Sequence, residues 1–156
     1  MSSEDLPIRR SSRLILLDPQ DRLLLFRYQG EHKPPFWSTA GGELQDAESF
    51  RQAAARELDE ETGFDAVIGD LICTREAVYA VAESTPARWQ EQYFLVRCDG
   101  GIPSNQGWTP EEHRTIADCK WWSEADVQST DETFLPGWLP DLRRHVVSDR
   151  SCRFEP

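Results

Sequence analysis

Three glutamates in the middle of the chain have the spacing expected of a single site. Glu57, Glu60 and Glu61 stand at positions i, i+3 and i+4, so on a helix their carboxylates share one face. Like charges one turn apart repel each other and destabilise an ordinary solvated helix. A hard divalent cation such as Mg²⁺ would remove this penalty, because it takes oxygen ligands and completes its shell with water and substrate phosphates. The spacing therefore favours a metal site that can receive a phosphate compound.

The sequence around these glutamates predicts the helix that would carry them. Ser49 suits the N-cap position and Gly63 the C-terminal stop. Most residues between them are good helix formers. Phe50, Ala54 and Leu58 fall on the opposite face, which predicts that the helix packs on a sheet.

The stretch from residue 42 to residue 64 resembles the signature of the Nudix hydrolases. That signature is Gly, five residues, Glu, seven residues, then Arg-Glu-apolar-any-Glu-Glu-any-Gly-apolar. Its nine specified positions are filled by Gly42, Glu48, Arg56, Glu57, Leu58, Glu60, Glu61, Gly63 and Phe64. A complete pattern at fixed spacing is a specific signal, whereas the carboxylates alone would favour an ordinary acidic surface helix. Ala40 is a departure, since family members often have Pro there, but it removes no functional group.

The resemblance implies roles for residues within and next to this stretch. The implied ligands of one or more Mg²⁺ ions, or alternatively Mn²⁺, are the Gly41 carbonyl and the carboxylates of Glu57, Glu60 and Glu61. Arg56 is expected to orient the neighbouring carboxylates through a bidentate contact with Glu48. An intrahelical pair between Arg56 and Glu60 is compatible with that role.

Family members commonly supply one more Glu from the region that here follows residue 102. Glu111 and Glu112 are the candidates by position, as an added metal ligand, base or substrate contact, with Glu112 preferred. Both also fit the first turn of a short helix, because Thr109 suits an N-cap and Pro110 the first helical position.

Three further residues are candidate substrate contacts, each with a structural alternative. Trp37 lies just before the glycine pair and is expected either to stack on a base or to belong to the core. Tyr79 is weakly similar to a Tyr of dinucleoside-polyphosphate hydrolases, but an isolated Tyr on a strand also packs. Glu91, at the start of a predicted strand, is a candidate ligand or substrate contact, or a carboxylate at the rim without a role.

The composition limits the classes of function and partner. The chain has 156 residues, of which 17 are basic and 28 acidic, and a net charge of −11. Nucleic-acid polymers and anionic membranes should therefore be repelled, whereas a small nucleotide can bind if metal ions bridge its phosphates to carboxylates. Four scattered cysteines and the lack of an apolar N-terminal segment predict reduced thiols in a cytoplasmic protein. The exposed tryptophans predict either a homodimer face or a base pocket.

Short apolar runs predict strands on both sides of the acidic helix. They span residues 12–17, 23–27, 90–98 and 119–122, with one or two more strands between residues 65 and 81. Short helices are expected after Ser123 and Pro140. This order predicts an α/β (α+β) fold with a mixed sheet covered on both faces, which agrees with the α/β/α sandwich that the resemblance implies. We expect a flexible lead-in over residues 1–10 and a single Nudix hydrolase domain over residues 11–150.

The leading hypothesis is Mg²⁺-dependent hydrolysis of a pyrophosphate bond in a nucleoside diphosphate linked to another moiety. The candidate substrates are nucleoside triphosphates, nucleotide sugars and dinucleoside polyphosphates. Bound metal would activate a water, and a carboxylate of the helix or Glu112 would accept its proton. The alternative is a catalytically weak Nudix-type module that senses a nucleotide, against which the complete set of carboxylates argues. A third hypothesis is a ligand- or partner-binding domain with an incidental acidic helix, which tight binding without metal would favour.

Overall fold

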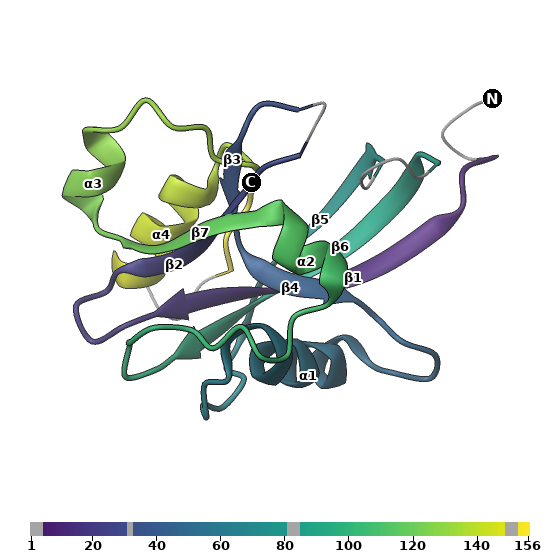
Figure 1. Cartoon of the computed structure of the whole chain (residues 1–156), viewed down its shortest axis with the longest axis horizontal. Helices are drawn as coiled ribbons and strands as arrows, with labels where there is room; N and C mark the ends of the chain where they lie inside the picture. Colours follow the sequence, from purple (N-terminus) through teal and green to yellow (C-terminus); the bar gives the residue numbers. More distant parts are fainter. Residues whose placement is uncertain (1–4, 31–32, 81–84, 149–152) are drawn as a thin grey trace.

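The computed structural model describes residues 5–30, 33–80, 85–148 and 153–156. Its strands are β1 (Ile8–Leu17), β2 (Leu23–Tyr28), β3 (Phe36–Ser38), β4 (Ala40–Glu43), β5 (Leu71–Tyr79), β6 (Ala87–Arg97) and β7 (Ile116–Trp122). Its helices are α1 (Phe50–Thr62), α2 (Pro110–Thr115), α3 (Glu124–Gln128) and α4 (Leu139–Ser148). Figure 1 shows how these elements are arranged.

β1 is the central strand of a mixed sheet. It runs parallel to β6 along its whole length, from Ile8 opposite Arg88 to Leu17 opposite Arg97. Its other edge pairs antiparallel with β4 over the middle, from Ser11 to Leu14, and with β2 at the end. β2 also pairs with β3 and β7, and β5 pairs with β6. Among the described residues the strand order is therefore β3-β2-β1-β6-β5, with β4 and β7 attached beside it.

Helices cover both faces of this sheet. Side chains alternate between the faces along β1, so Leu14 and Leu16 pack on the α1 side while Ile15 and Leu17 pack on the α4 side. The residues of the two helices in these cores are Ala54 and Leu58 of α1, and Leu139, Leu142 and Val146 of α4. In Figure 1, α1 lies below the strands and α4 above them. The predicted α/β/α sandwich with a mixed sheet is confirmed.

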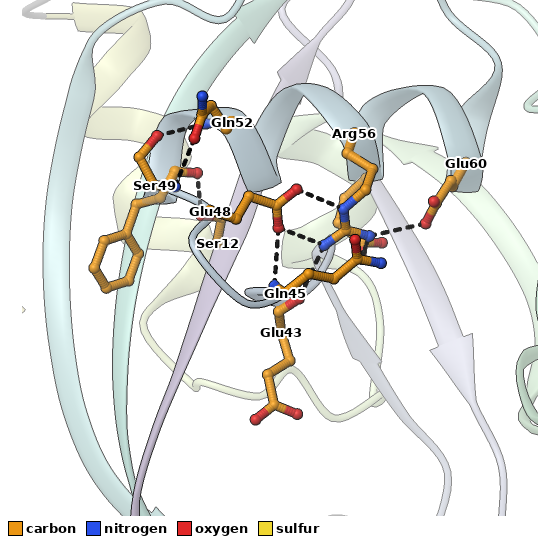
Figure 2. Close-up of polar contacts among 10 residues, drawn as sticks. Ser12, Glu43, Gln45, Glu48, Ser49, Gln52, Arg56 and Glu60 are labelled. Carbon is orange, nitrogen blue, oxygen red and sulfur yellow. Dashed lines mark hydrogen bonds and ion pairs between the residues drawn. The ribbon is translucent and has the colours of Figure 1, made fainter.

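The ends of α1 are fixed by the residues that the sequence indicated. The Ser49 hydroxyl accepts a hydrogen bond from the Gln52 backbone, and the Gln52 side chain accepts one from the Ser49 backbone, which forms a capping box (Figure 2). Gly63 ends the helix in the left-handed conformation with a φ of 70°, and its N–H donates to the Asp59 carbonyl. These contacts set the position of every carboxylate on the helix.

Two predicted boundaries differ from the structure. The apolar run at residues 66–68 is not a strand: Val67 is 83% exposed, and the Ile68 carbonyl accepts a hydrogen bond from Arg51 of α1. That run instead crosses from α1 back to the sheet, and β5 begins only at Leu71. The sheet also begins at Ile8, so the lead-in expected over residues 1–10 overlaps β1. Residues 1–4 lie outside the described part of the chain.

Cys73, Cys98 and Cys119 are free thiols, and burial raises the pKa of Cys73 to about 12. The fourth cysteine of the sequence, Cys152, lies outside the described residues. None of the helices in the described ranges is long and apolar enough to cross a membrane.

Candidate active site

Two carboxylates of α1 lie directly against the glycine pair of β4. Glu57 and Glu61 are buried, with 8% and 3% of their surfaces exposed. The Gly41 N–H donates to Glu61 Oε2 over 3.3 Å. A Cβ added at Gly42 would lie 2.4 Å from Glu57 Oε1. The missing side chain at Gly42 therefore lets the helix bring its carboxylates onto the strand backbone.

Gly41 could not be replaced without moving the central strand. Its φ of 139° is one that other residues rarely adopt, and a Cβ there would lie 2.1 Å from the carbonyl oxygen of Ser12 on β1. Gly41 pairs in register with Arg13. The predicted carbonyl ligand thus sits on a rigid strand beside Glu61.

Arg56 braces the acidic face of the helix (Figure 2). Its Nε and Nη2 donate to the two carboxylate oxygens of Glu48 over 2.8 and 2.9 Å, which is the bidentate contact that the resemblance implied. Its Nη1 donates to Glu57 over 2.8 Å and to Glu60 over 3.0 Å. Nη2 also bonds the Glu43 carbonyl. One guanidinium therefore ties three carboxylates and the end of β4 together.

The short helix α2 brings a fourth glutamate to this group. Glu112 lies close enough to Glu61 for its negative charge to raise the pKa of Glu61. A capping box fixes the turn, because Glu112 Oε1 accepts from the Thr109 N–H over 2.9 Å. Glu111, on the same turn, is exposed and is an ordinary first-turn residue. The structure thus favours Glu112 of the two positional candidates.

The buried carboxylates have perturbed acidities because they share a small volume. Burial is the largest cause that raises the pKa of Glu61 well above its ordinary value, and the charges of Glu57 and Glu112 raise it further. Burial also raises the pKa of Glu57, although Arg56 opposes the shift. In contrast, Arg56 holds the pKa of the partly buried Glu48 below its ordinary value. Glu57 and Glu61 thus form a site with more negative charge than Arg56 compensates.

Two residues that the sequence reasoning missed border this site. Burial and then the charge of Glu61 raise the pKa of Tyr28, and Glu112 and Glu57 add to this effect. Tyr28 stacks on Phe36, with ring centroids 5.5 Å apart. Arg13 lies beside Gly41 through the β1–β4 register. A charged residue inside an apolar strand was the available signal for Arg13, whereas only the strand pairing reveals Tyr28.

The other predicted substrate contacts lie away from the carboxylates. Of the two alternatives for Trp37, the structure favours the core: Trp37 is 4% exposed in the α4-side core, edge-on to Trp122 at 5.1 Å. Glu91 is 2% exposed, and both of its carboxylate oxygens accept hydrogen bonds within the sheet, one of them from the Tyr79 hydroxyl. Glu91 is therefore a structural partner rather than a metal ligand, and it forms a second cluster with Tyr79.

The donor atoms of the first site suit a hard divalent cation. They are carboxylate and carbonyl oxygens, which are the ligands that Mg²⁺ and Mn²⁺ prefer, and their uncompensated charge is what a cation would neutralise. Across residues 5–30, 33–80, 85–148 and 153–156, no three acidic, His or Cys side chains yet converge on one point. Arg56 holds Glu57 and Glu60 where they stand. A cation would compete with Arg56 for these oxygens and keep Glu61 and the Gly41 carbonyl as further ligands.

Comparison with known proteins gives a family match over most of the chain. A sequence model of the NUDIX domain matches residues 7–142. Octanoyltransferase of Myxococcus xanthus is 39% identical over 74 residues, which are 47% of this chain but only 20% of that protein. The present chain therefore spans about a fifth of the length of that curated relative.

Solved structures share the fold at low sequence identity. The MutT protein from Methanosarcina mazei Go1 is 18% identical, with a TM-score of 0.66 over 94% of this chain and 98% of that one. The dihydroneopterin triphosphate pyrophosphohydrolase of E. coli is 19% identical, with a TM-score of 0.61 over 89% and 95%. These likenesses establish a common fold.

Proposed function

The chain belongs to the Nudix family of hydrolases, and from that premise we propose that it cleaves a pyrophosphate bond in a nucleoside diphosphate linked to another moiety, with Mg²⁺ as its metal. The observation that carries this proposal is the burial of Glu57 and Glu61 against the glycine pair of β4, where the charge of Glu112 also acts on Glu61. Such a cluster destabilises the fold unless a cation neutralises it. A cation bound between the carboxylates and a pyrophosphate would neutralise negative charge on both.

The residues of α1 and β4 would hold the metal ion and orient the carboxylates that bind it. We assign Glu57, Glu60, Glu61 and the Gly41 carbonyl as the metal ligands. When bound, the cation would neutralise the pyrophosphate and lower the pKa of the attacking water. Arg56 keeps the carboxylates aimed, because its bidentate contact with Glu48 fixes the guanidinium plane. The rigid capping box at Ser49 holds the helix in register with the glycine pair.

Glu112 is our candidate for the proton acceptor. It lies beside Glu61 but comes from a different element, and Arg56 does not contact it. Its second oxygen is free of the capping box that uses Oε1. Glu112→Gln keeps an oxygen that can accept the Thr109 N–H, so the variant separates proton acceptance from helix capping. It should lower kcat by about 10²-fold or more and leave α2 folded.

The names of two structural relatives support this class of reaction. A MutT protein and a triphosphate pyrophosphohydrolase share the fold. Their names support cleavage of a pyrophosphate bond and do not indicate which nucleoside diphosphate derivative this chain takes.

A product-resolved screen tests the proposal. The protein would be incubated with Mg²⁺ and a panel of nucleoside triphosphates, nucleotide sugars, ADP-ribose and dinucleoside polyphosphates, with Glu61→Gln as control. We expect turnover that needs the metal and disappears in the variant, with products that reveal which bond is cut. Folded protein that binds nucleotides but turns none over would contradict hydrolysis and favour a nucleotide sensor.

A further inference from the structure

One end of the sheet carries a charged cluster on the face that α4 covers elsewhere. On β1 the apolar Ile15 and Leu17 lie under α4, whereas Arg13 continues the same face beyond it. In Figure 1 this end of β1, β5 and β6 projects away from α4. The members of the cluster are Ser11, Arg13, Arg75, Tyr79 and Glu91.

Glu91 is the centre that holds the cluster together. Its two oxygens accept from Arg75 Nη1 and the Tyr79 hydroxyl at 2.9 Å each, and from Ser11 Oγ at 3.3 Å. Burial alone would raise the pKa of Glu91, but Arg13 and Arg75 outweigh it and hold the pKa below its ordinary value. Two guanidinium groups around one carboxylate leave one positive charge. This region is therefore cationic in a chain whose net charge is −11.

Arg13 is the member of the cluster that is least firmly held. Its Nε lies 3.4 Å from Glu91 and its Nη1 lies 3.4 Å from the Thr39 carbonyl, both at the long limit of a hydrogen bond. Within the described residues its Nη2 donates no hydrogen bond, and the side chain is 20% exposed. A guanidinium has five N–H donors in a fork that fits a phosphate, so Arg13 keeps donors for a ligand.

Arg13 also reaches the site of the proposed hydrolysis. It pairs with Gly41 on β4, and its Cδ would lie 3.1 Å from a Cβ at that glycine. The Gly41 N–H bonds Glu61, on which the charge of Arg13 acts directly. Arg13 is therefore a positive group beside Gly41, close enough to Glu61 for their charges to interact.

We propose that Arg13 binds a third phosphate, so that the preferred substrate is a nucleoside with three or more phosphates in a row rather than a two-phosphate nucleotide sugar. This inference rests on the proposed function. Glu91, Arg75 and Tyr79 are positioning residues, since they hold Arg13 and do not touch the phosphate. A two-phosphate substrate would use both of its phosphates at the carboxylates and present a neutral sugar to Arg13.

Steady-state kinetics with Arg13→Gln tests this specificity. We would measure kcat/KM in Mg²⁺ for a nucleoside triphosphate and for a diphosphate sugar of the same nucleoside. The loss of charged hydrogen bonds should lower kcat/KM for the triphosphate by about 10- to 100-fold and that for the sugar by less than about threefold. Arg10→Gln is the matched control, because Arg10 is exposed on the other face of β1 and bonds Gln90; it should leave both values unchanged. Equal losses on both substrates, or none, would overturn the inference.

Two further measurements keep the test decisive. If Arg13→Gln does not fold, Arg13→Lys keeps the charge and should still show a selective loss of about three- to tenfold on the triphosphate, while equal losses would overturn the inference. Binding of methylene-bridged analogues, which resist hydrolysis, separates this proposal from the reaction. If the unsubstituted protein binds the triphosphate analogue more tightly than the diphosphate-sugar analogue, and Arg13→Gln loses this preference, the phosphate site is supported even if no substrate is turned over. Equal binding of the two analogues overturns the site even if hydrolysis is observed.

Discussion

Glu61 and Glu91 are both almost fully buried, yet their surroundings shift their acidities in opposite directions. Glu61 is 3% exposed and lies among other carboxylates, which together with burial raise its pKa. Glu91 is 2% exposed and lies between two arginines, which lower its pKa despite burial. The fold thus surrounds Glu91 with positive partners, whereas it surrounds Glu61 with further negative charge.

The difference indicates which cluster needs something from outside the chain. The Glu91 carboxylate has its partners within the fold, because two guanidinium groups, a phenol and a hydroxyl donate to it. Among the described residues, the Glu61 carboxylate accepts a hydrogen bond only from the Gly41 N–H, over a long 3.3 Å, and the charges of Glu57 and Glu112 oppose its ionisation. Buried charge without compensation is a frequent mark of a functional site.

Glu61→Gln should abolish the proposed reaction while keeping the fold. Loss of a metal ligand removes several kcal/mol of transition-state stabilisation, which corresponds to about 10³-fold in kcat. Glu111→Gln is the matched control, since this exposed glutamate of α2 lies outside the cluster. Rates of pyrophosphate-bond cleavage and a circular dichroism spectrum would be measured for both. Full activity in Glu61→Gln would contradict the claim that Glu61 takes part in the reaction.

Glu91→Gln should instead cost stability. It leaves Arg13 and Arg75 without their counter-charge, and breaking a buried ion pair typically costs about 3–5 kcal/mol. Because both arginines are partly exposed, we expect a decrease of about 2 kcal/mol in the free energy of unfolding. Urea denaturation would measure it. An unchanged midpoint would mean that Glu91 is not the centre of a structural cluster.

Arg56→Gln should weaken both metal binding and turnover without abolishing them. Arg56 acts by orienting Glu57 and Glu60, and loss of such support typically costs about 10- to 100-fold. Arg51→Gln on the same helix is a suitable control, since Arg51 bonds the Ile68 carbonyl at the far side. A loss as large as that of Glu61→Gln would assign Arg56 a direct part in the reaction.

The smallest effect concerns pH in the absence of metal. The folded-state pKa of Glu61 lies above its ordinary value of 4.5, so ionisation opposes folding as the pH rises from about 4.5 through the folded pKa. Glu61→Gln should therefore have a higher unfolding temperature than the unsubstituted protein at about pH 8, and the same unfolding temperature near pH 4.5. The contribution of Glu91, which is lost as pH falls, is common to both proteins and cancels. A difference that does not depend on pH would contradict the raised pKa.

The helix and its ends could be predicted because their signals are local. Ser49 and Gly63 act within one turn of α1, and the i, i+3, i+4 spacing fixes the shared face of the carboxylates. The short run 66–68 could not be predicted in this way. The apolar residues near Val67 resemble a strand, but no neighbouring edge takes them up. Pro110 and Thr109 indicated a capped turn, and α2 is what they form.

Contacts across the sheet could not be predicted in the same way. Arg13 meets Gly41, and Glu91 meets Arg75, only because of strand order and register, which apolar patterning does not fix. Trp37 shows the same limit, since its place in the core follows from its neighbour Trp122 on β7. The sequence thus indicated the Glu61 site through a motif and left the Glu91 cluster to the fold.

Binding of Mn²⁺, followed by the paramagnetic resonance signal of the free ion, tests the central claim most directly. We predict that the unsubstituted protein takes up Mn²⁺ and that Glu61→Gln binds it at least about tenfold more weakly. Glu91→Gln, where it remains folded, should bind it as the unsubstituted protein does. Equal binding by Glu61→Gln, or none by the unsubstituted protein, would show that the buried carboxylates of α1 are not built to receive a cation.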